Sequence, residues 1–319
     1  PFSQTRQEPE KLAEGRKSTC SFTFHRAKRF AFSTMIYQQQ TINCRGRLLD
    51  LTKPVVMGIL NVTPDSFFAG SRLESPGDVL RQAEKMLSEG AAILDVGGMS
   101  SRPGAAILSE DEELARALPA VEAIVKNFPE ALISIDTIRS QVAKTCVEGG
   151  AGIVNDISAG RFDDKMYETV AALGTPYILM HMQGKPETMQ VEPEYAEVVR
   201  DVLDFFIREL GKLRSLGVKD VIIDPGFGFG KTVEHNYRLL THLHVFQMLE
   251  APVLAGISRK SMICKVLKVN PERALNGTTA LHVIALQQGS KILRAHDVRE
   301  AVEVIQLFQA VENSQLGER

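Results

Sequence analysis

Residues 55–70 read VVMGILNVTPDSFFAG, an apolar run that ends at Asn61 and continues into a polar loop. The run is too short for a helix and therefore predicts a buried strand. Other short apolar runs end in the same way before a helical pattern, and the residues that close them are Asp95, Asp136, Asn155 and Asp156, His181, Asp224, Ser258 and Arg294. Parallel strands in a barrel bring their carboxyl ends to one face, so these residues are expected around one mouth.

The hydrophobic pattern predicts strands and helices in strict alternation. Strands are expected near residues 55–60, 92–96, 132–136, 152–156, 177–181, 220–224, 253–257 and 291–294. Helices are expected near residues 76–89, 110–127, 138–147, 163–173, 194–216, 233–243, 276–288 and 297–310. This order favours an α/β protein with a (β/α)8 TIM barrel, and an open doubly wound sheet is the alternative.

The first forty residues differ from the rest of the chain. They are basic, with scattered Ser and Phe and no sustained period, so we expect a disordered extension ahead of a true start at Met35; an organellar transit peptide is the alternative. Residues 41–51 alternate around Arg45-Gly46, which predicts a hairpin below the barrel. The expected organisation is an extension over 1–40 and a single catalytic barrel domain over 41–315.

Composition excludes several classes of protein. The 319 residues are 44% hydrophobic and 24% charged with a formal net charge of −2, which predicts a soluble globular protein without nucleic-acid or membrane partners. The four cysteines are widely spaced and contain no CxxC pair, so neither a zinc site nor a disulfide framework is indicated. Reduced thiols point to a cytoplasmic location.

Asp136 and Asn155 close neighbouring predicted strands. A carboxylate and an amide at adjacent strand ends can bind the donor and acceptor edges of a planar heterocycle. Asp and Asn are also common helix N-caps, and that reading stays open for either residue taken alone.

The glycine-rich run DPGFGFGK at residues 224–231 is not a nucleotide-binding motif. It lacks the spacing of a P-loop and comes too late in the chain for a dinucleotide fingerprint. Its glycines allow a flat ligand to approach the backbone, and Phe227 and Phe229 can pack against that ligand.

Cationic and hydroxyl side chains follow three other predicted strands. They are Ser258-Arg259-Lys260-Ser261, Arg294 with His296, and Arg102. Barrels often bind phosphate near their last two strands, and Arg presents a planar fork to phosphate oxygens. Their convergence predicts an anion site.

These motifs together resemble the dihydropteroate synthase family. The similar segments are GILNVTPDSF (58–67), SRPG (101–104), IDT (135–137), Asn155-Asp156, MHMQG (180–184), 224–231, SRKS (258–261) and RAH (294–296). The resemblance spans about residues 41–310. It implies condensation of 6-hydroxymethyl-7,8-dihydropterin pyrophosphate with p-aminobenzoate, a folate-pathway transferase reaction and a target of sulfonamides.

The resemblance also implies roles for individual residues. Catalytic roles fall to Asp136, Asp224, Lys260, Arg294 and His296, and Asn155 joins Asp136, Asp224 and Lys260 in holding the pterin. The pyrophosphate would be bound by Arg102, Arg294, His296 and Mg2+, with Asn61 as the metal ligand. The remaining substrate-binding residues would be Ser101, Pro103, Phe229, Ser258, Phe67 and Met180. A homodimer through helices near the end of the chain is implied as well.

Met99 stands where the family often carries Glu, and Ser101 where it often carries Thr. Two other functions remain open: a methyltetrahydrofolate-dependent methyltransferase, and a non-catalytic pterin-binding paralogue. Neither of them needs a pyrophosphate site.

Overall fold

The structure is a computed structural model that describes residues 39–62, 76–99, 108–184, 189 and 193–316. Contacts divide the chain into Pro1–Met35 and Ile36–Arg319, and every described residue belongs to the second unit. The expected disordered extension therefore lies almost wholly outside the described residues. Among the described helices, none combines the length and hydropathy of a membrane span.

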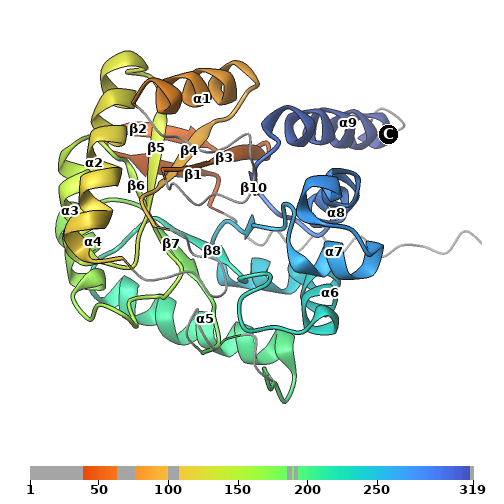
Figure 1. Ribbon diagram of the computed structural model, residues 1–319. Coiled ribbons are helices and arrows are strands. Elements are labelled where there is room, and N and C mark those ends of the chain that lie inside the picture. The colour runs from red at the N-terminus through yellow and green to blue at the C-terminus, as the bar shows by residue number, and fades with distance from the viewer. Residues whose placement is uncertain (1–38, 63–75, 100–107, 185–188, 190–192, 317–319) are drawn as a thin grey trace, which may run out of the picture. The chain divides into compact units, whose positions relative to one another are not determined.

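Eight parallel strands form the centre of the described unit (Figure 1). They are β3 (Val55–Asn61), β4 (Ile93–Gly97), β5 (Leu132–Asp136), β6 (Ile153–Asp156), β7 (Tyr177–Met180), β8 (Val221–Asp224), β9 (Leu254–Ala255) and β10 (Ile292–Ala295). β10 pairs with β3, and a parallel bridge between Ile223 and Val253 joins β8 to the segment before β9. The ring closes, which confirms the predicted barrel.

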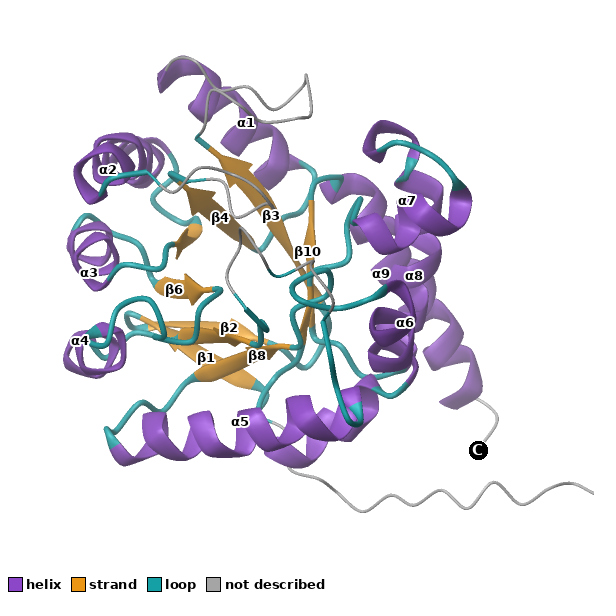
Figure 2. Cartoon of the chain, turned by 60° about the horizontal axis from the view of Figure 1, so that its bottom comes forward, coloured by secondary structure: helices purple, strands orange, loops and turns teal. Residues whose placement is uncertain are grey.

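Helices surround the strands (Figure 2). They are α1 (Pro76–Ser88), α2 (Glu110–Asn127), α3 (Ser140–Glu148), α4 (Met166–Leu173), α5 (Val198–Ser215), α6 (Val233–Thr241), α7 (Ser261–Leu267), α8 (Leu275–Gln287) and α9 (Val298–Leu316), with 3-10 turns at η1 (Leu243–Leu249) and η2 (Pro271–Arg273). α2 begins with a capping box, in which Ser109 and Glu112 bond each other's backbone N–H.

Two details after β8 differ from the prediction. The strand expected over 253–257 has only the two residues of β9, which pair with β10, and Val253 before it makes a single bridge to Ile223. The chain turns a few residues later, where Lys260 N donates to Ile257 O and Arg259 adopts a φ of 55°. A helix start was expected near residues 258–261, but no helix range was predicted there, and the structure has the seven-residue helix α7, which begins without a side-chain cap.

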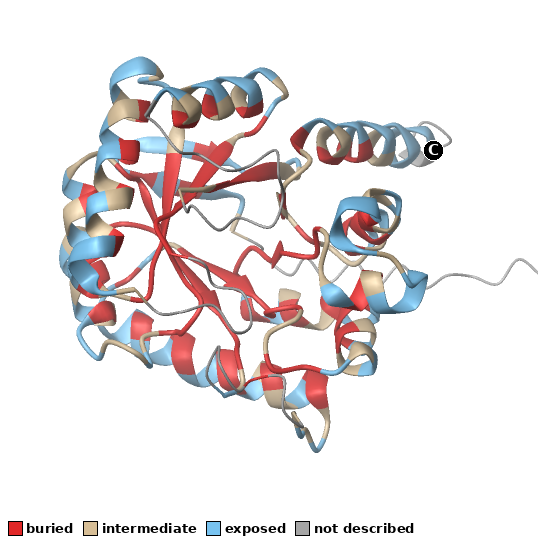
Figure 3. Cartoon of the chain, viewed as in Figure 1, coloured by how far each residue is buried: buried red, intermediate tan, exposed pale blue. Residues whose placement is uncertain are grey.

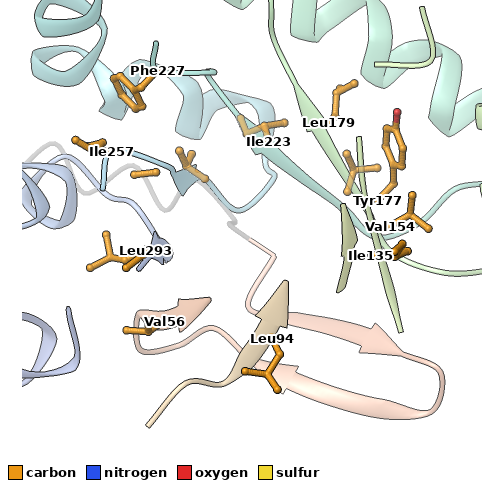
Figure 4. Packing of buried hydrophobic residues seen from close by; sticks show 14 of the residues in the cluster. Val56, Leu94, Ile135, Val154, Tyr177, Leu179, Ile223, Phe227, Ile257 and Leu293 are labelled. Carbon is orange, nitrogen blue, oxygen red and sulfur yellow. The ribbon is translucent and has the colours of Figure 1, made fainter. Parts of the chain in front are cut away.

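The strands are buried on both faces (Figure 3), as parallel strands covered by helices are. Their outward side chains pack under the helices, and Figure 4 shows Val56, Leu94 and Val154 among them. The inward side chains at the amino-terminal end form a second apolar layer, made of Met57, Ile93, Ile153, Ile178, Ile222, Leu254 and Ile292.

A two-stranded hairpin closes this amino-terminal end. β1 (Thr41–Cys44) and β2 (Arg47–Asp50) pair antiparallel, and their buried residues Ile42, Cys44 and Leu49 pack on the inward apolar layer. Arg45 and Gly46 both have positive φ, 55° and 88°, as a tight hairpin turn requires. The predicted hairpin is confirmed.

Candidate active site

Polar residues occupy the inward face of the barrel two positions beyond the apolar layer. Successive side chains of a strand alternate between faces, so residues i and i+2 share one face. The pairs are Ile93 and Asp95, Ile153 and Asn155, Ile222 and Asp224, and Ile292 and Arg294; β7 is the exception, where Ile178 is followed by the apolar Met180. The same strands thus build an apolar base and, one layer higher, a polar site.

Strand register aligns the first part of this site. Asn61 lies opposite Gly97, Gly97 opposite Asp136, and Asp136 opposite Asn155. Gly97 leaves room between its neighbours, because a Cβ there would lie 3.3 Å from Asn61 Oδ1 and 3.7 Å from Asp136 Cβ. Asn61 and Asp136 therefore flank one gap at the carboxyl ends of the strands.

Arg294 connects two buried carboxylates. Its Nε donates to Asp95 Oδ2 at 2.6 Å, and its Nη2 donates to Asp136 Oδ2 at 2.8 Å. Asn155 Nδ2 donates to the same Asp95 oxygen at 3.0 Å. Four side chains from four strands therefore form one hydrogen-bonded network.

This network perturbs the pKa of two of its members. Burial raises the pKa of Asp136 to about 7; Arg294 opposes the rise, while Asp95 adds to it. Burial alone would lower the pKa of Arg294, but Asp95 and Asp136 outweigh it, so that pKa is raised. A carboxyl group that titrates near neutrality beside a permanent cation is typical of a functional site.

A second group of residues lies on the other side of the mouth. Lys260 Nζ donates to Phe227 O and lies 4.5 Å from the centre of the Phe229 ring. Burial lowers the pKa of Lys260 to about 8, against an opposing effect of Asp224. Burial raises the pKa of Asp224, and the charges of Lys260 and Arg294 oppose that rise. The charge of Arg294 thus lowers the pKa of Asp136 on one side of the mouth and of Asp224 on the other.

Lys231 fastens the glycine-rich loop that carries Phe227 and Phe229. Its buried Nζ donates to the carbonyls of Gly226 at 3.0 Å and Phe229 at 3.1 Å, and lies 2.9 Å from His181 Nδ1. Gly226 has a φ of 70°, and a Cβ there would lie 1.9 Å from His181 O, so only glycine fits. Lys231 and His181 therefore support the loop from below.

The segments after β9 and β10 meet through two contacts. Ser258 Oγ and His296 Nδ1 are 3.0 Å apart. Arg259 binds Asp297 with two hydrogen bonds of 2.7 and 2.8 Å and donates to the carbonyls of Pro271 and Glu272. Arg259 was expected to contribute to the anion site, but these bonds direct it into the protein.

The structure places most of the predicted site residues around one mouth. Those it brings together are Asp136, Asn155, Asp224, Lys260, Arg294, Phe229, Asn61, Met180, Ser258 and His296. Met180 is buried in an apolar cluster with Met99, Met182 and Met189, which Phe229 contacts. Phe67, Ser101, Arg102 and Pro103 lie outside the described residues, and the roles of all these residues stay predictions.

Asp95 was not predicted as a site residue, and Asp156 was expected at the mouth but is bound elsewhere. Asp95 was expected to close its strand but lies in the middle of β4, and its place at the centre of the network follows only from the strand register. Asp156, the neighbour of Asn155, does not join the mouth, because its carboxylate accepts from Tyr177 OH and from the backbone of Ser158 and Gly160.

The expected Mg2+ needs oxygen ligands at the mouth of the barrel. Among the described residues, no three His, Cys, Asp or Glu side chains group as a metal cluster. Mg2+ often keeps its waters and takes one or two protein oxygens together with substrate phosphates. The Asn61 amide, beside the gap at Gly97, fits a metal that is bound mainly through a phosphate-bearing substrate.

Comparison with known proteins identifies the family. The family model described as pterin binding enzyme matches residues 57–296. The dihydropteroate synthase of Escherichia coli K12 is 45% identical over 277 residues, which cover 86% of this chain and 98% of that protein.

Solved structures of the same family are similar to this chain over most of its length. A Yersinia pestis dihydropteroate synthase with a sulfonamide drug complex has a TM-score of 0.83 and 42% identity, covering 86% of this chain and 99% of that one. A Xanthomonas albilineans dihydropteroate synthase in complex with 7,8-dihydropteroate has a TM-score of 0.76 and 36% identity, covering 85% of this chain and 98% of that one. The chain therefore belongs to the pterin-binding enzymes and, among them, to the dihydropteroate synthase family.

Proposed function

We propose that the protein condenses 6-hydroxymethyl-7,8-dihydropterin pyrophosphate with p-aminobenzoate to give 7,8-dihydropteroate and pyrophosphate. The observation that carries this proposal is the ring of Asp136, Asn155, Asp224 and Lys260 around one buried mouth, with Arg294 joined to it. The sequence similarity to dihydropteroate synthases supports it independently.

The pterin is held by the buried polar ring. A pterin presents both N–H donors and ring-nitrogen or carbonyl acceptors in one plane. The carboxylates of Asp136 and Asp224 accept from its donors, and the Lys260 ammonium donates to its acceptors. Asn155 supplies an amide at the strand next to Asp136.

The reaction depends on the departure of pyrophosphate. A bond forms between the amine nitrogen of p-aminobenzoate and the methylene carbon of the pterin, while the bond from that carbon to the pyrophosphate oxygen breaks. The electron pair leaves with pyrophosphate, and the nitrogen releases one proton. An aniline nitrogen is neutral at pH 7, so the reaction needs no Ser–His or Cys–His pair to generate a nucleophile.

The charges of the site match this change. Arg294 and His296 stabilise the negative charge that grows on the leaving pyrophosphate, and Arg102, outside the described residues, joins them. Asp136 and Asp224 stabilise positive charge at the pterin methylene. When bound with the pyrophosphate, Mg2+ supplies further neutralisation of its oxygens, and Asn61 is the residue that would hold it.

p-Aminobenzoate occupies the rim beside the pterin. Phe229 provides an aromatic wall, and Ser258 is held there by its contact with His296. Ser101, Pro103 and Phe67 complete this slot in our proposal. The Yersinia pestis structure contains a sulfonamide drug complex, and we propose that sulfonamides bind this chain as well.

The assembly and location are proposed on separate grounds. α8 packs against both α7 and α9, and these three helices expose apolar side chains: Val266, Leu267, Val283, Leu307 and Val311. Exposed apolar surface of this kind supports a homodimer, with residues 41–315 of each chain as one catalytic domain.

The free thiols of Cys44, Cys146 and Cys264 are those of a protein kept in a reducing compartment such as the cytoplasm.

The deciding experiment measures pyrophosphate release with dihydropterin pyrophosphate, p-aminobenzoate and Mg2+, each omitted in turn. Release that requires both organic substrates, with dihydropteroate formed in equal amount, establishes the reaction. Pterin binding without release indicates a non-catalytic pterin-binding protein. Methyl transfer from methyltetrahydrofolate, without any pyrophosphate release, indicates the methyltransferase.

A further inference from the structure

Asp95 is the most deeply buried acid of the network. Its side chain has no exposed surface, and one oxygen, Oδ2, accepts from both Asn155 and Arg294. Two residues that the proposed function assigns to different parts of the substrate thus depend on a single oxygen atom.

The chemistry of this contact fixes the orientation of Asn155. An ionised carboxylate only accepts hydrogen bonds, whereas an amide has a donor side, NH2, and an acceptor side, the carbonyl oxygen. Because Nδ2 of Asn155 is directed at Asp95, the amide cannot turn over without placing two acceptors against each other. Asn155 is therefore held with its Oδ1 away from Asp95.

The second oxygen of Asp95 gives an independent reason to look for function. Oδ1 is buried and finds no hydrogen-bond partner among the described residues. A buried acceptor without a donor destabilises the folded state. An aspartate that served only stability would be expected to have hydrogen bonds to both of its carboxylate oxygens.

We infer that Asp95 is a positioning residue that sets the hydrogen-bonding polarity of Asn155, so that residue 155 accepts a hydrogen bond from the pterin, and that it orients Arg294 through the same oxygen. This inference rests on the proposed function. It explains why an acid stands on β4, the strand between those that carry Asn61 and Asp136.

The test exchanges the two polar groups. Asn155→Asp places two carboxylates against each other and is expected to weaken binding of dihydropterin pyrophosphate, measured by calorimetry without p-aminobenzoate, by roughly 100-fold. The double variant Asp95→Asn/Asn155→Asp again pairs an NH2 group with a carboxylate and leaves an acceptor at position 155. It is expected to recover binding to within about tenfold of the unaltered protein, and not fully, because the NH2 group of residue 95 then also faces Arg294 Nε, which loses its acceptor there.

The matched control is Asp156→Asn in the Asn155→Asp background. Asp156 is as buried as Asp95 and lies next to residue 155, but its carboxylate binds Tyr177 OH instead. Asp156→Asn removes the same charge but provides no NH2 group for the carboxylate at position 155, so it should not restore pterin binding. Steady-state kinetics should show the recovery in the KM for the pterin substrate and much less in the KM for p-aminobenzoate.

Several outcomes overturn the inference. They are full binding by Asn155→Asp, no recovery in the double variant, and equal recovery by Asp95→Asn and Asp156→Asn. Should Asn155→Asp fail to fold, thermal unfolding of the two double variants makes the same comparison. A starting protein that binds no dihydropterin pyrophosphate contradicts the proposed function itself, which separates that failure from a failure of the inference.

Discussion

The two ends of the barrel differ in chemistry although the same strands build both. At the amino-terminal end, inward residues such as Ile153 and Ile222 pack on the hairpin in a layer that is apolar except for Ser134 among the described residues. Two residues further along, Asn155 and Asp224 carry hydrogen-bonding groups that are equally buried. The first layer gains free energy from burial, whereas the second loses some of it by desolvating charges. The apolar end therefore stabilises a fold that the polar end would weaken.

Removing the carboxylate of Asp136 should produce the largest effect on function. Asp136→Ala takes away a pterin acceptor and leaves Arg294 paired with Asp95 alone, so kcat/KM for the pterin substrate should fall on the order of 10³-fold. The measurement is initial-rate pyrophosphate release, with circular dichroism to establish that the fold is kept. Near-normal activity would contradict the assignment of the pterin site.

Truncating the apolar layer should have the opposite profile. Ile153 is fully buried, and Ile153→Ala should lower the free energy of unfolding by about 2–5 kcal/mol. Urea denaturation measures this loss, and kcat/KM of the folded protein should change little. Ile207→Ala is the control, because Ile207 is 55% exposed on α5; a cost equal to that of Ile153→Ala would contradict the proposed division between the two ends.

The pH dependence of the reaction should report the electrostatics of the polar end. The pKa of Asp136 is raised to about 7, so this group is protonated below that pH and ionised above it. If the ionised form binds the pterin, kcat/KM should fall about tenfold per pH unit below 7 and level off above it.

Arg294→Met gives the control for this profile. The charge of Arg294 holds the Asp136 pKa down, so its removal should move the inflection of the residual activity to higher pH. An inflection that stays in place would show that another group controls the profile.

The sequence predicts the barrel well because its signals are local. Each strand is a short apolar run with a polar residue at or near its end, and Asp136 and Asp224 close β5 and β8 as that pattern predicts. The elements that were predicted less well are short: β9 has two residues, and α7 has seven and begins without a side-chain cap.

The site was only partly predictable because its contacts join distant parts of the chain. The bond between Arg294 and Asp95 links residues 199 positions apart, and no local pattern tells which carboxylate Arg294 approaches. For the same reason the sequence does not reveal that Arg259 is bound to Asp297 or that Lys231 supports the glycine-rich loop. These facts follow from the register and closure of the strands.

Gly46 offers the smallest and most local test, at the hairpin that closes the apolar end. It has a φ of 88° but nothing within 4 Å of a Cβ, so Gly46→Ala adds backbone strain without a steric clash. We expect a loss of about 1 kcal/mol in unfolding free energy and no change in kcat. Gly211→Ala is the matched control, because Gly211 lies within α5 with equally open space. It should stabilise the protein by up to about 1 kcal/mol in the same denaturation experiment, since alanine favours a helix interior. A loss of stability at both positions would show that the added methyl group itself is destabilising. The left-handed backbone of the hairpin turn would then not be the cause of the loss at Gly46.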